Sequence, residues 1–271
     1  MTIGPIWLVG CGNMGSAMLR GWISDGFDAD QIVIVDPLLS STLPGVRLFP
    51  APPAHEPVPA VVVLAVKPQM LSQTAPLLAP LLGADTMLVS ILAGTEIATL
   101  RRNFPAPTSV VRAMPNLPAS IGKGVTVLMG DHVDTEQHAA VATLMAPLGG
   151  VEWIDDETQF HAITALSGSG PAFVFRFITA LAAGGAELGL PVDLATRLAL
   201  LTTQGSAALA LTSAESLTDL AERVASPGGT TRAGLDVLDQ NPAFADAVAQ
   251  TLAAAAQRSR ELAVADGKNE A

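Results

Sequence analysis

The hydrophobic positions in the first half of the chain fall into short runs separated by polar or glycine-containing segments. Ile6–Val9 and Ile32–Val35 are such runs, and Val61–Val66 is a continuous apolar run of the kind that a strand covered on both faces requires. The later strand candidates are Met87–Ile91, Ser109–Arg112, Val125–Met129 and Val151–Ile154. Because these runs alternate with helical stretches, they predict an α/β fold with a Rossmann-like, doubly wound and mostly parallel sheet.

The segment between the second and third of these strands departs from the alternation. Residues 38–60 contain six prolines and show no helical period. Proline interrupts helices, so this crossover is expected to be shortened or irregular where a doubly wound sheet would usually have a helix.

The character of the sequence changes after about Asp156. Strand-like runs give way to Ala/Leu-rich segments with helical spacing. Near the end, Phe244, Val248, Leu252 and Ala256 recur at four-residue intervals on one face of a long terminal helix. The sequence therefore predicts two domains, a first of residues 1–156 built on the sheet and a second, all-α domain of residues 157–271.

Composition narrows the class of protein. Hydrophobic residues make up 49% of the 271 residues and charged residues 14%, which excludes intrinsic disorder. The net charge of −11 and the lack of Lys/Arg clusters argue against a nucleic-acid or anionic-membrane partner. The single cysteine, Cys11, cannot form an internal disulfide or a cysteine-based zinc site. We therefore expect no metal and a reducing, cytoplasmic compartment.

Two further patterns concern membranes and assembly. The N-terminus has no positive segment ahead of its apolar residues and is not typical of a signal peptide. The most apolar long window, Phe173–Leu190, is interrupted by Arg176, Gly184, Gly185 and Glu187, so no spanning helix is expected. A mean hydropathy of +0.44 is high for a small soluble monomer, and much of the alanine and leucine is expected to lie under a subunit interface.

A glycine pattern follows the first predicted strand. Gly10, Gly12 and Gly15 are spaced as G-x-G-x-x-G at the start of a predicted helix. The first glycine permits a tight turn, the second lets the backbone approach a pyrophosphate, and the third lets helix and strand pack closely. This context predicts dinucleotide binding, with a plain glycine turn as the alternative. The predicted cofactor site also includes the residues inside the pattern, Cys11, Asn13 and Met14, and Cys11 is interpreted as a packing residue.

Asp36 ends the second predicted strand, where an acidic residue would accept hydrogen bonds from the adenosine ribose hydroxyls. A carboxylate there would repel a 2′-phosphate, which favours NAD over NADP. The alternative is a turn-forming aspartate before Pro37.

Later strand ends supply further candidates for the cofactor site. Lys67 is one of only three lysines, and its segment follows the third strand at the edge where ligands bind in open α/β sheets. The side chain would contact ribose or nicotinamide amide oxygens. The candidates in this segment are Ala65, Val66, Lys67 and Pro68. Met114 and Asn116 follow the fifth strand candidate and would line the nicotinamide pocket.

Two loops of small residues dominate the helical half. Ser167–Ala172 is expected to open a helix near Pro171, and Ser226–Thr231 is expected to open another. Each would expose helix N–H groups and hydroxyls, which bind a carboxylate without a cationic side chain. Ordinary N-capping is the alternative for one loop alone, but two loops on a dinucleotide-binding protein favour an anion site.

Five motifs occur in one order: GCGNMGSA, AVKPQ, VRAMPN, ALSGSGPAF and SPGGTT. Together they resemble the pyrroline-5-carboxylate reductase family, from about Ile6 to Leu262, and the last two motifs are specific to it. The resemblance implies reduction of L-1-pyrroline-5-carboxylate to L-proline by NADPH or NADH, the final step of proline biosynthesis. It also implies a helical domain that interlocks with a second subunit, with dimers often assembling into decamers.

The resemblance also implies residue roles. Gly10–Gly15 would hold the cofactor pyrophosphate. The amides of Gly229 and Thr230 and the threonine hydroxyls would bind the substrate carboxylate, and the Thr231 hydroxyl would point at the ring nitrogen as the catalytic group. The substrate-binding residues are thus Ser226, Gly228, Gly229, Thr230 and Thr231. Asp36 and the proline-rich crossover depart from the family pattern and leave the choice between NADPH and NADH open.

Three alternatives remain. The first is reduction of another cyclic imino acid. The second is a β-hydroxyacid dehydrogenase, but such enzymes use a lysine on the first long helix after the boundary, and PAFVFRFITALAAGGAELGL contains none. The third is a non-catalytic dinucleotide sensor, which predicts damage to SPGGTT or to the glycine pattern, and both are intact. None of the four histidines lies in a motif, so none is assigned a catalytic role.

Overall fold

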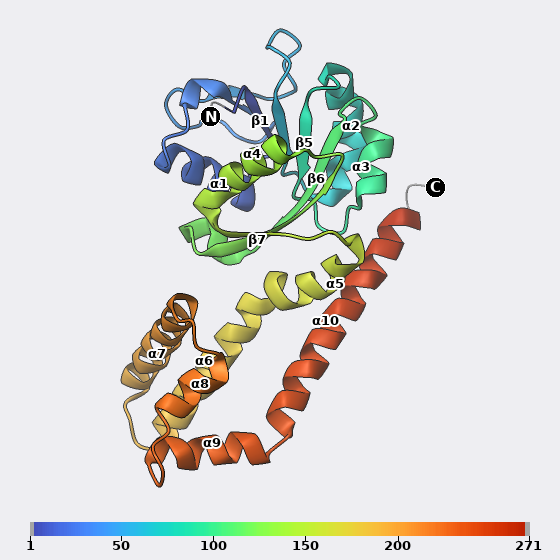
Figure 1. Cartoon of the computed structure of the whole chain (residues 1–271). Helices are drawn as coiled ribbons and strands as arrows, with labels where there is room; N and C mark the ends of the chain where they lie inside the picture. Colours follow the sequence, from blue (N-terminus) through green and yellow to red (C-terminus); the bar gives the residue numbers. More distant parts are fainter. Residues whose placement is uncertain (1–2, 269–271) are drawn as a thin grey trace. The chain divides into compact units, whose positions relative to one another are not determined.

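The computed structural model describes residues 3–268, which form two compact units (Figure 1). One unit holds the chain up to Gly168 together with the stretch from Ala256 onward, and the other holds Ser169–Ala255. The domain boundary expected after residue 156 stays a prediction.

The first unit is built on one eight-stranded sheet with the order β3-β2-β1-β4-β5-β6-β7-β8. Neighbouring strands run parallel except for the antiparallel pair of β6 and β7. The predicted mostly parallel, doubly wound sheet is confirmed. The strands are β1 (Ile6–Val9), β2 (Ile32–Val35), β3 (Arg47–Phe49), β4 (Val61–Leu64), β5 (Met87–Ser90), β6 (Ser109–Pro115), β7 (Gly124–Asp131) and β8 (Gly149–Trp153).

Helices cover both faces of this sheet, which is why its central strands are apolar throughout. Residues of α1 (Asn13–Ser24) and α4 (Thr135–Met145) pack with Ile6 and Leu8 on one face. Residues of α2 (Leu71–Leu78) and α3 (Ile97–Asn103) pack with Trp7 and Val9 on the other (Figure 1). Alternate residues of one strand therefore serve two cores. Trp22 joins α1 to α4, since its Nε1 donates to the Leu144 carbonyl at 2.7 Å.

Short 3₁₀ turns connect these elements. They are η1 (Ala29–Gln31), η2 (Pro68–Met70), η3 (Ala79–Leu81), η4 (Leu117–Ile121), η5 (Ala146–Leu148) and η6 (Glu157–Gln159).

The proline-rich crossover contains no helix among its residues, as expected, but it contains a short strand that was not predicted. β3 adds in parallel to the edge of the sheet beside β2. An edge strand needs a ladder on one side only, so a three-residue segment between prolines can pair there. Arg47 of β3 forms an ion pair with Glu56 and donates to the Asp30 carbonyl, which ties the crossover to the unit.

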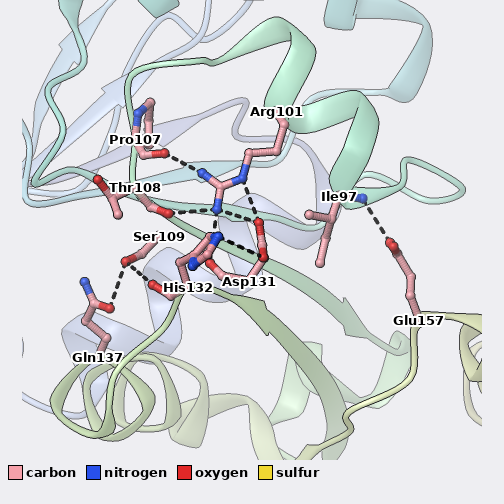
Figure 2. A network of polar contacts seen from close by, with 9 residues as sticks. All are labelled: Ile97, Arg101, Pro107, Thr108, Ser109, Asp131, His132, Gln137 and Glu157. Carbon is pink, nitrogen blue, oxygen red and sulfur yellow. Dashed lines mark hydrogen bonds and ion pairs between the residues drawn. The ribbon is translucent and has the colours of Figure 1, made fainter.

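Strand lengths differ from the prediction where tertiary pairing decides them. β4 ends at Leu64, and only the Ala65 N–H continues its pairing with β1. β6 continues to Pro115 because β7 pairs with it as far as Pro115–Thr126. The far end of this pair is fastened by Arg101 of α3. Its guanidinium donates to the carboxylate of Asp131 and to the carbonyls of Pro107 and Thr108 (Figure 2).

The second unit is all-α, as predicted. It contains α6 (Gly170–Glu187), α7 (Val192–Thr212), α8 (Leu217–Arg223), α9 (Thr230–Gln240) and the first half of α10 (Ala243–Lys268). Its core is small. Among its described residues, the buried hydrophobic side chains are Ile178, Ala195, Ala199 and Ala225. Large apolar side chains are instead exposed, such as Phe175 at 55% and Leu201 at 63%.

The segment before α6 differs from the sequence expectation. α5 (Phe160–Ile163) passes through a π-helical turn, η7 (Thr164–Gly168), towards α6. Counted as one helix over Glu157–Glu187, this stretch is long and apolar enough to cross a membrane, and 6% of its most apolar window is buried. The expectation that no helix is long and apolar enough to span a membrane was therefore wrong, although length and composition alone are weak evidence for a membrane span.

Candidate functional site

The glycine turn lies where the carboxyl ends of β1, β2 and β4 meet. Gly10 has a φ of +93°, a conformation that favours glycine, and its N–H donates to the Val35 carbonyl at 2.9 Å. A Cβ at this position would lie 2.8 Å from the carbonyl carbon and oxygen of Ala65. Gly10 thus allows two strand ends to approach, at the point where the strand order reverses and open α/β sheets bind ligands.

The other two glycines have different surroundings. A Cβ on Gly15 would collide with the Gly10 carbonyl oxygen, so Gly15 is required by the packing of α1 against the turn. A Cβ on Gly12 would meet nothing within 4 Å, and Gly12 is exposed. The protein itself does not require glycine at residue 12, which points to the space needed by a ligand. This observation fits a bound pyrophosphate.

The start of α1 is suited to an anion. Gly12 is its N-cap and supplies no side-chain cap, and the first turn contains no acidic residue. Within the described residues, the N–H groups of Asn13, Met14 and Gly15 have no hydrogen-bond acceptor. Unpaired N–H groups and the helix dipole together form a binding site for phosphate.

The carboxylate of Asp36 is held rigidly beside this turn. Its Oδ2 accepts the Cys11 N–H at 2.7 Å, and its Oδ1 accepts the Leu38 N–H at 2.8 Å. Both sequence interpretations are compatible with this geometry, because the Leu38 bond makes a turn while the carboxylate remains at the end of β2. No lysine or arginine occurs in residues 37–46, and Arg47 is already paired with Glu56.

Cys11 lies inside the turn as a buried side chain. Burial, and then the negative charge of Asp36, raise the pKa of its thiol. The protonated thiol is a small apolar packing group, and this environment does not favour a reactive thiolate.

Lys67 stands at the carboxyl end of β4, where the chain enters η2. The Ala65 N–H donates to the Val9 carbonyl at 2.7 Å, which continues the pairing with β1 before Val66 turns away. Pro68 begins η2, and the Lys67 side chain is exposed. The structure therefore brings Lys67 to the same sheet edge as the glycine turn.

Met114 and Asn116 lie at the end of β6, but Asn116 is already engaged. Its Oδ1 accepts the Val125 N–H at 3.0 Å, and its Nδ2 donates to the Ser167 carbonyl at 3.2 Å. Asn116 thus joins β6, β7 and the π turn, which leaves one N–H and one oxygen lone pair of its amide for a ligand, and its role at the cofactor stays a prediction. The Met114 sulfur accepts the Thr164 hydroxyl at 3.1 Å, so Met114 also faces this turn.

Arg112 and Glu157 were not predicted as a functional pair. The Arg112 guanidinium is buried, donates to the Glu157 carboxylate at 2.9 Å and lies 4.1 Å from the centroid of the Phe160 ring. Glu157 also accepts the Ile97 N–H at the start of α3 (Figure 2). The pair fastens the segment after β8 to the sheet. An arginine within an apolar strand run was the available sequence signal.

The Ser167–Ala172 segment does open a helix near Pro171, since α6 begins at Gly170, but helical turns precede it that were not expected. Ser169 has helical dihedral angles, and the chain is already helical from Phe160 through the π turn. Preceding helical turns therefore stand where a free helix end was expected. A π turn widens the helix by one residue per turn and is frequent at functional sites. In the first turn of α6, Pro171 has no N–H and the Ala172 N–H donates to the Ser169 carbonyl at 3.0 Å.

The second loop, Ser226–Thr231, does open a helix. Gly228 has a φ of +71°, and the Gly229 N–H donates to the Ser226 carbonyl at 2.9 Å. Proline followed by a glycine with positive φ, closed by this bond, is typical of a type II turn. The Gly229 amide is thus occupied, which corrects its expected role as a carboxylate ligand.

The unpaired amides lie one residue further on. Gly229 is the N-cap of α9 and contributes no side-chain cap, and Thr230 and Thr231 form the first turn. Among the described residues, neither their N–H groups nor the Thr231 hydroxyl has a hydrogen-bond partner, and both threonines are exposed. A carboxylate and a second polar atom can be bound here together. Thr231 is not itself the cap of α9.

No group of three or more His, Cys, Asp or Glu side chains is placed to hold a metal ion within the described part of the chain. His161 donates to or accepts from the Ser259 hydroxyl at 3.0 Å, and burial followed by the charges of Arg112 and Arg260 lowers its pKa. This contact joins α5 to the second half of α10 within the first unit.

Two family models match the chain. Residues 157–262 match the model described as pyrroline-5-carboxylate reductase dimerisation. Residues 5–94 match the model described as NADP oxidoreductase, coenzyme F420-dependent.

Relatives match nearly the whole chain. A pyrroline-5-carboxylate reductase of Pseudomonas aeruginosa is 38% identical over 269 residues, covering 97% of this chain and 98% of the relative. A solved pyrroline-5-carboxylate reductase from Coxiella burnetii has a TM-score of 0.90 and 32% identity, with 96% of this chain and 98% of that chain covered. The Plasmodium falciparum pyrroline carboxylate reductase with NADP bound has a TM-score of 0.81 and 27% identity, with 97% and 99% covered.

Proposed function

Because the chain belongs to the pyrroline-5-carboxylate reductase family, we propose that its glycine turn and its Ser226–Thr231 loop divide the reaction between cofactor and substrate. The protein is an NADP-dependent oxidoreductase that reduces the C=N bond of L-1-pyrroline-5-carboxylate to give L-proline. The observation that carries the residue assignment is the loop, which presents two unpaired amides and a threonine hydroxyl at one helix start.

The first unit holds the cofactor in this proposal. The amides at the start of α1 bind the pyrophosphate in the space beside Gly12, and Asp36 accepts the adenosine ribose hydroxyls. Lys67, with Pro68 fixing its loop, and Met114 border the nicotinamide end. When bound, NADPH or NADH supplies the hydride.

The second unit binds the substrate. The amides of Thr230 and Thr231 bind the carboxylate, which gains from the positive end of the α9 dipole. The Thr231 hydroxyl stabilises the ring nitrogen as it changes from imine to amine. A protonated cyclic imine is already electrophilic, so the chain needs no histidine or carboxylic acid as a strong general acid. The amine proton comes from the protonated imine or from solvent.

An assay with paired substrates tests this function. Oxidation of NADPH or NADH should require a cyclic imino acid, with L-1-pyrroline-5-carboxylate giving the highest kcat/KM. Turnover with 3-hydroxy acids and none with the imine would contradict the proposal and favour a β-hydroxyacid dehydrogenase.

Asp36 is expected to set the balance between the two cofactors. Its fixed charge opposes a 2′-phosphate, and at about 4–5 Å this repulsion amounts to roughly 1–4 kcal/mol. Asp36→Asn removes the charge but keeps one acceptor oxygen. We expect it to raise the NADPH-to-NADH ratio of kcat/KM by about tenfold or more. Asp28→Asn is the control, because Asp28 also accepts a turn amide, that of Asp30. An unchanged ratio in Asp36→Asn would exclude this role.

The second unit also provides the interface for a homodimer in this proposal. Its described residues leave large apolar side chains exposed, and a groove of about 660 Å³ between α6 and α7 is lined by residues including Phe175, Ile178, Val192 and Leu200. The family model for this region is a dimerisation model. A second copy that covers this face supplies the core that one unit lacks. We also propose a cytoplasmic enzyme of proline biosynthesis, acting at its last step, with decamers as a further assembly.

Light scattering checks the dimer. The wild-type chain should be dimeric or larger at micromolar concentration, and Phe175→Asp should weaken the assembly because it places a charge in the apolar groove. Leu77→Asp is the matched control, since Leu77 is 61% exposed but lies on α2 of the first unit. An active wild-type monomer would contradict the expectation.

A further inference from the structure

Arg232 directly follows Thr231 in the first turn of α9, and three carboxylates hold its guanidinium. Its Nη1 donates to both oxygens of Glu222, at 2.7 and 2.9 Å. Its Nε donates to Asp236 Oδ1 at 2.9 Å and its Nη2 to Asp239 Oδ2 at 3.0 Å. An arginine beside a carboxylate-binding loop is ordinarily a candidate ligand for the carboxylate. Here its charge and four of its five donors are already matched within the protein.

The bond to Glu222 differs from the other two because it spans the substrate loop. Glu222 lies near the end of α8 and Arg232 near the start of α9, with residues 224–229 between the two helices. Asp236 and Asp239 lie on α9 itself. Among the residues that the structure describes, no other side-chain hydrogen bond or ion pair connects α8 to α9. The bridge therefore holds the two ends of the loop together.

We propose that Glu222 and Arg232 are positioning residues, whose bridge aims the first turn of α9 at the substrate. The type II turn determines the conformation at the tip of the loop. The bridge fixes the orientation of α8 and α9 relative to each other at the two ends of the loop. This orientation of α9 determines where the Thr230 and Thr231 amides and the Thr231 hydroxyl point. The inference rests on the proposed function of this loop.

The geometry makes this ion pair more ordered than an isolated ion pair on the surface. One nitrogen, Nη1, contacts both oxygens of Glu222, the pair belongs to a network of four charged side chains, and the Arg232 side chain is only 25% exposed. Isolated exposed pairs contribute little to stability, but here all three guanidinium nitrogens are held by carboxylates, which fixes the direction of the side chain. Misplacing a reacting group by about 1 Å can cost about 10²-fold in rate, so a small loss of order here is measurable.

The test compares two alanine substitutions that each remove one carboxylate from the same arginine. Glu222→Ala breaks the contact across the loop, and Asp239→Ala breaks a contact within α9. We expect Glu222→Ala to raise the KM for L-1-pyrroline-5-carboxylate by about tenfold and to lower kcat several-fold. Asp239→Ala should stay within about twofold of wild type in both constants. The NADPH dissociation constant should be unchanged in both variants, because the cofactor residues lie in the first unit.

Equal KM values in Glu222→Ala and Asp239→Ala would overturn the proposal, as would an equal loss of NADPH affinity. If circular dichroism shows Glu222→Ala to be unfolded, Glu222→Gln serves instead, since it keeps the side-chain volume and one acceptor oxygen. It should raise KM about threefold, and an unchanged KM would be contradictory. A wild-type chain that does not turn over the imine contradicts the proposed function, whereas an active wild type with an unaffected Glu222→Ala contradicts this inference alone.

Discussion

Replacing Thr231 with alanine should lower kcat by about 10- to 150-fold while leaving NADPH affinity unchanged. Loss of a hydrogen bond to a partner that carries charge costs about 1.5–3 kcal/mol, and this bond is proposed to strengthen as the ring nitrogen becomes an amine. The proposed cofactor residues belong to the first unit, whereas Thr231 belongs to the second. Steady-state kinetics with both substrates saturating, together with NADPH titration, measure the two effects separately.

Structural damage does not account for such an effect. Gly229, not Thr231, caps α9, and the Thr231 hydroxyl is exposed without a partner among the described residues. The melting temperature of Thr231→Ala should therefore match that of wild type. Thr231→Ser keeps the hydroxyl and should retain most of the activity. A folded Thr231→Ala enzyme with near-normal kcat would show that this hydroxyl has no catalytic role.

Replacing Gly12 with valine should have the opposite profile, with cofactor affinity reduced by on the order of a hundredfold or more. The valine methyl groups would occupy the space proposed for the pyrophosphate, and loss of two charge-assisted hydrogen bonds costs roughly 1.5–3 kcal/mol each. The fold should tolerate the change, because a Cβ at Gly12 meets nothing within 4 Å and its backbone is extended. Calorimetric titration with NADPH measures the affinity.

Gly15→Ala provides the contrasting control for Gly12→Val. Its Cβ would collide with the Gly10 carbonyl oxygen, so this substitution should destabilise the unit, by about 1–3 kcal/mol, in a thermal melt. Wild-type NADPH affinity in a folded Gly12→Val protein would contradict the assignment of the glycine turn.

The sheet and the helical half could be predicted because their signals are local. Short apolar runs, alternating with helices, are sufficient to indicate a doubly wound sheet. β3 could not be found in this way, since its three residues lie between prolines and pair only because the edge of β2 is available. The π turn at Thr164–Gly168 was also hidden, because a glycine- and serine-rich sequence before a proline ordinarily indicates a helix start.

The candidate site was predictable in residue type but not in bonding. Asn116 was expected to offer its amide to the cofactor, yet its partners lie 51 and 9 residues away in sequence, at Ser167 and Val125. The Gly229 amide is used by its own turn, which moves the unpaired donors to Thr230 and Thr231. Hydrogen-bond partners depend on tertiary contacts, and a motif shows only which groups are present.

The glycines show the reverse case, in which the structure sharpens a sequence argument. Their spacing suggested three roles. The space around a Cβ added at each glycine distinguishes these roles. Gly10 and Gly15 are needed by the protein, whereas Gly12 is needed only if a ligand approaches. That difference is the strongest evidence in the first unit for a bound dinucleotide.

A crystal structure of the protein with NADP⁺ and L-proline tests the division of roles most directly. The account predicts that the proline carboxylate accepts the N–H groups of Thr230 and Thr231 and that the ring nitrogen lies about 2.6–3.2 Å from the Thr231 hydroxyl oxygen. It also predicts the pyrophosphate on the amides of Asn13–Gly15, beside Gly12. Proline bound without contact to the Ser226–Thr231 loop, or a pyrophosphate away from the glycine turn, would contradict the account.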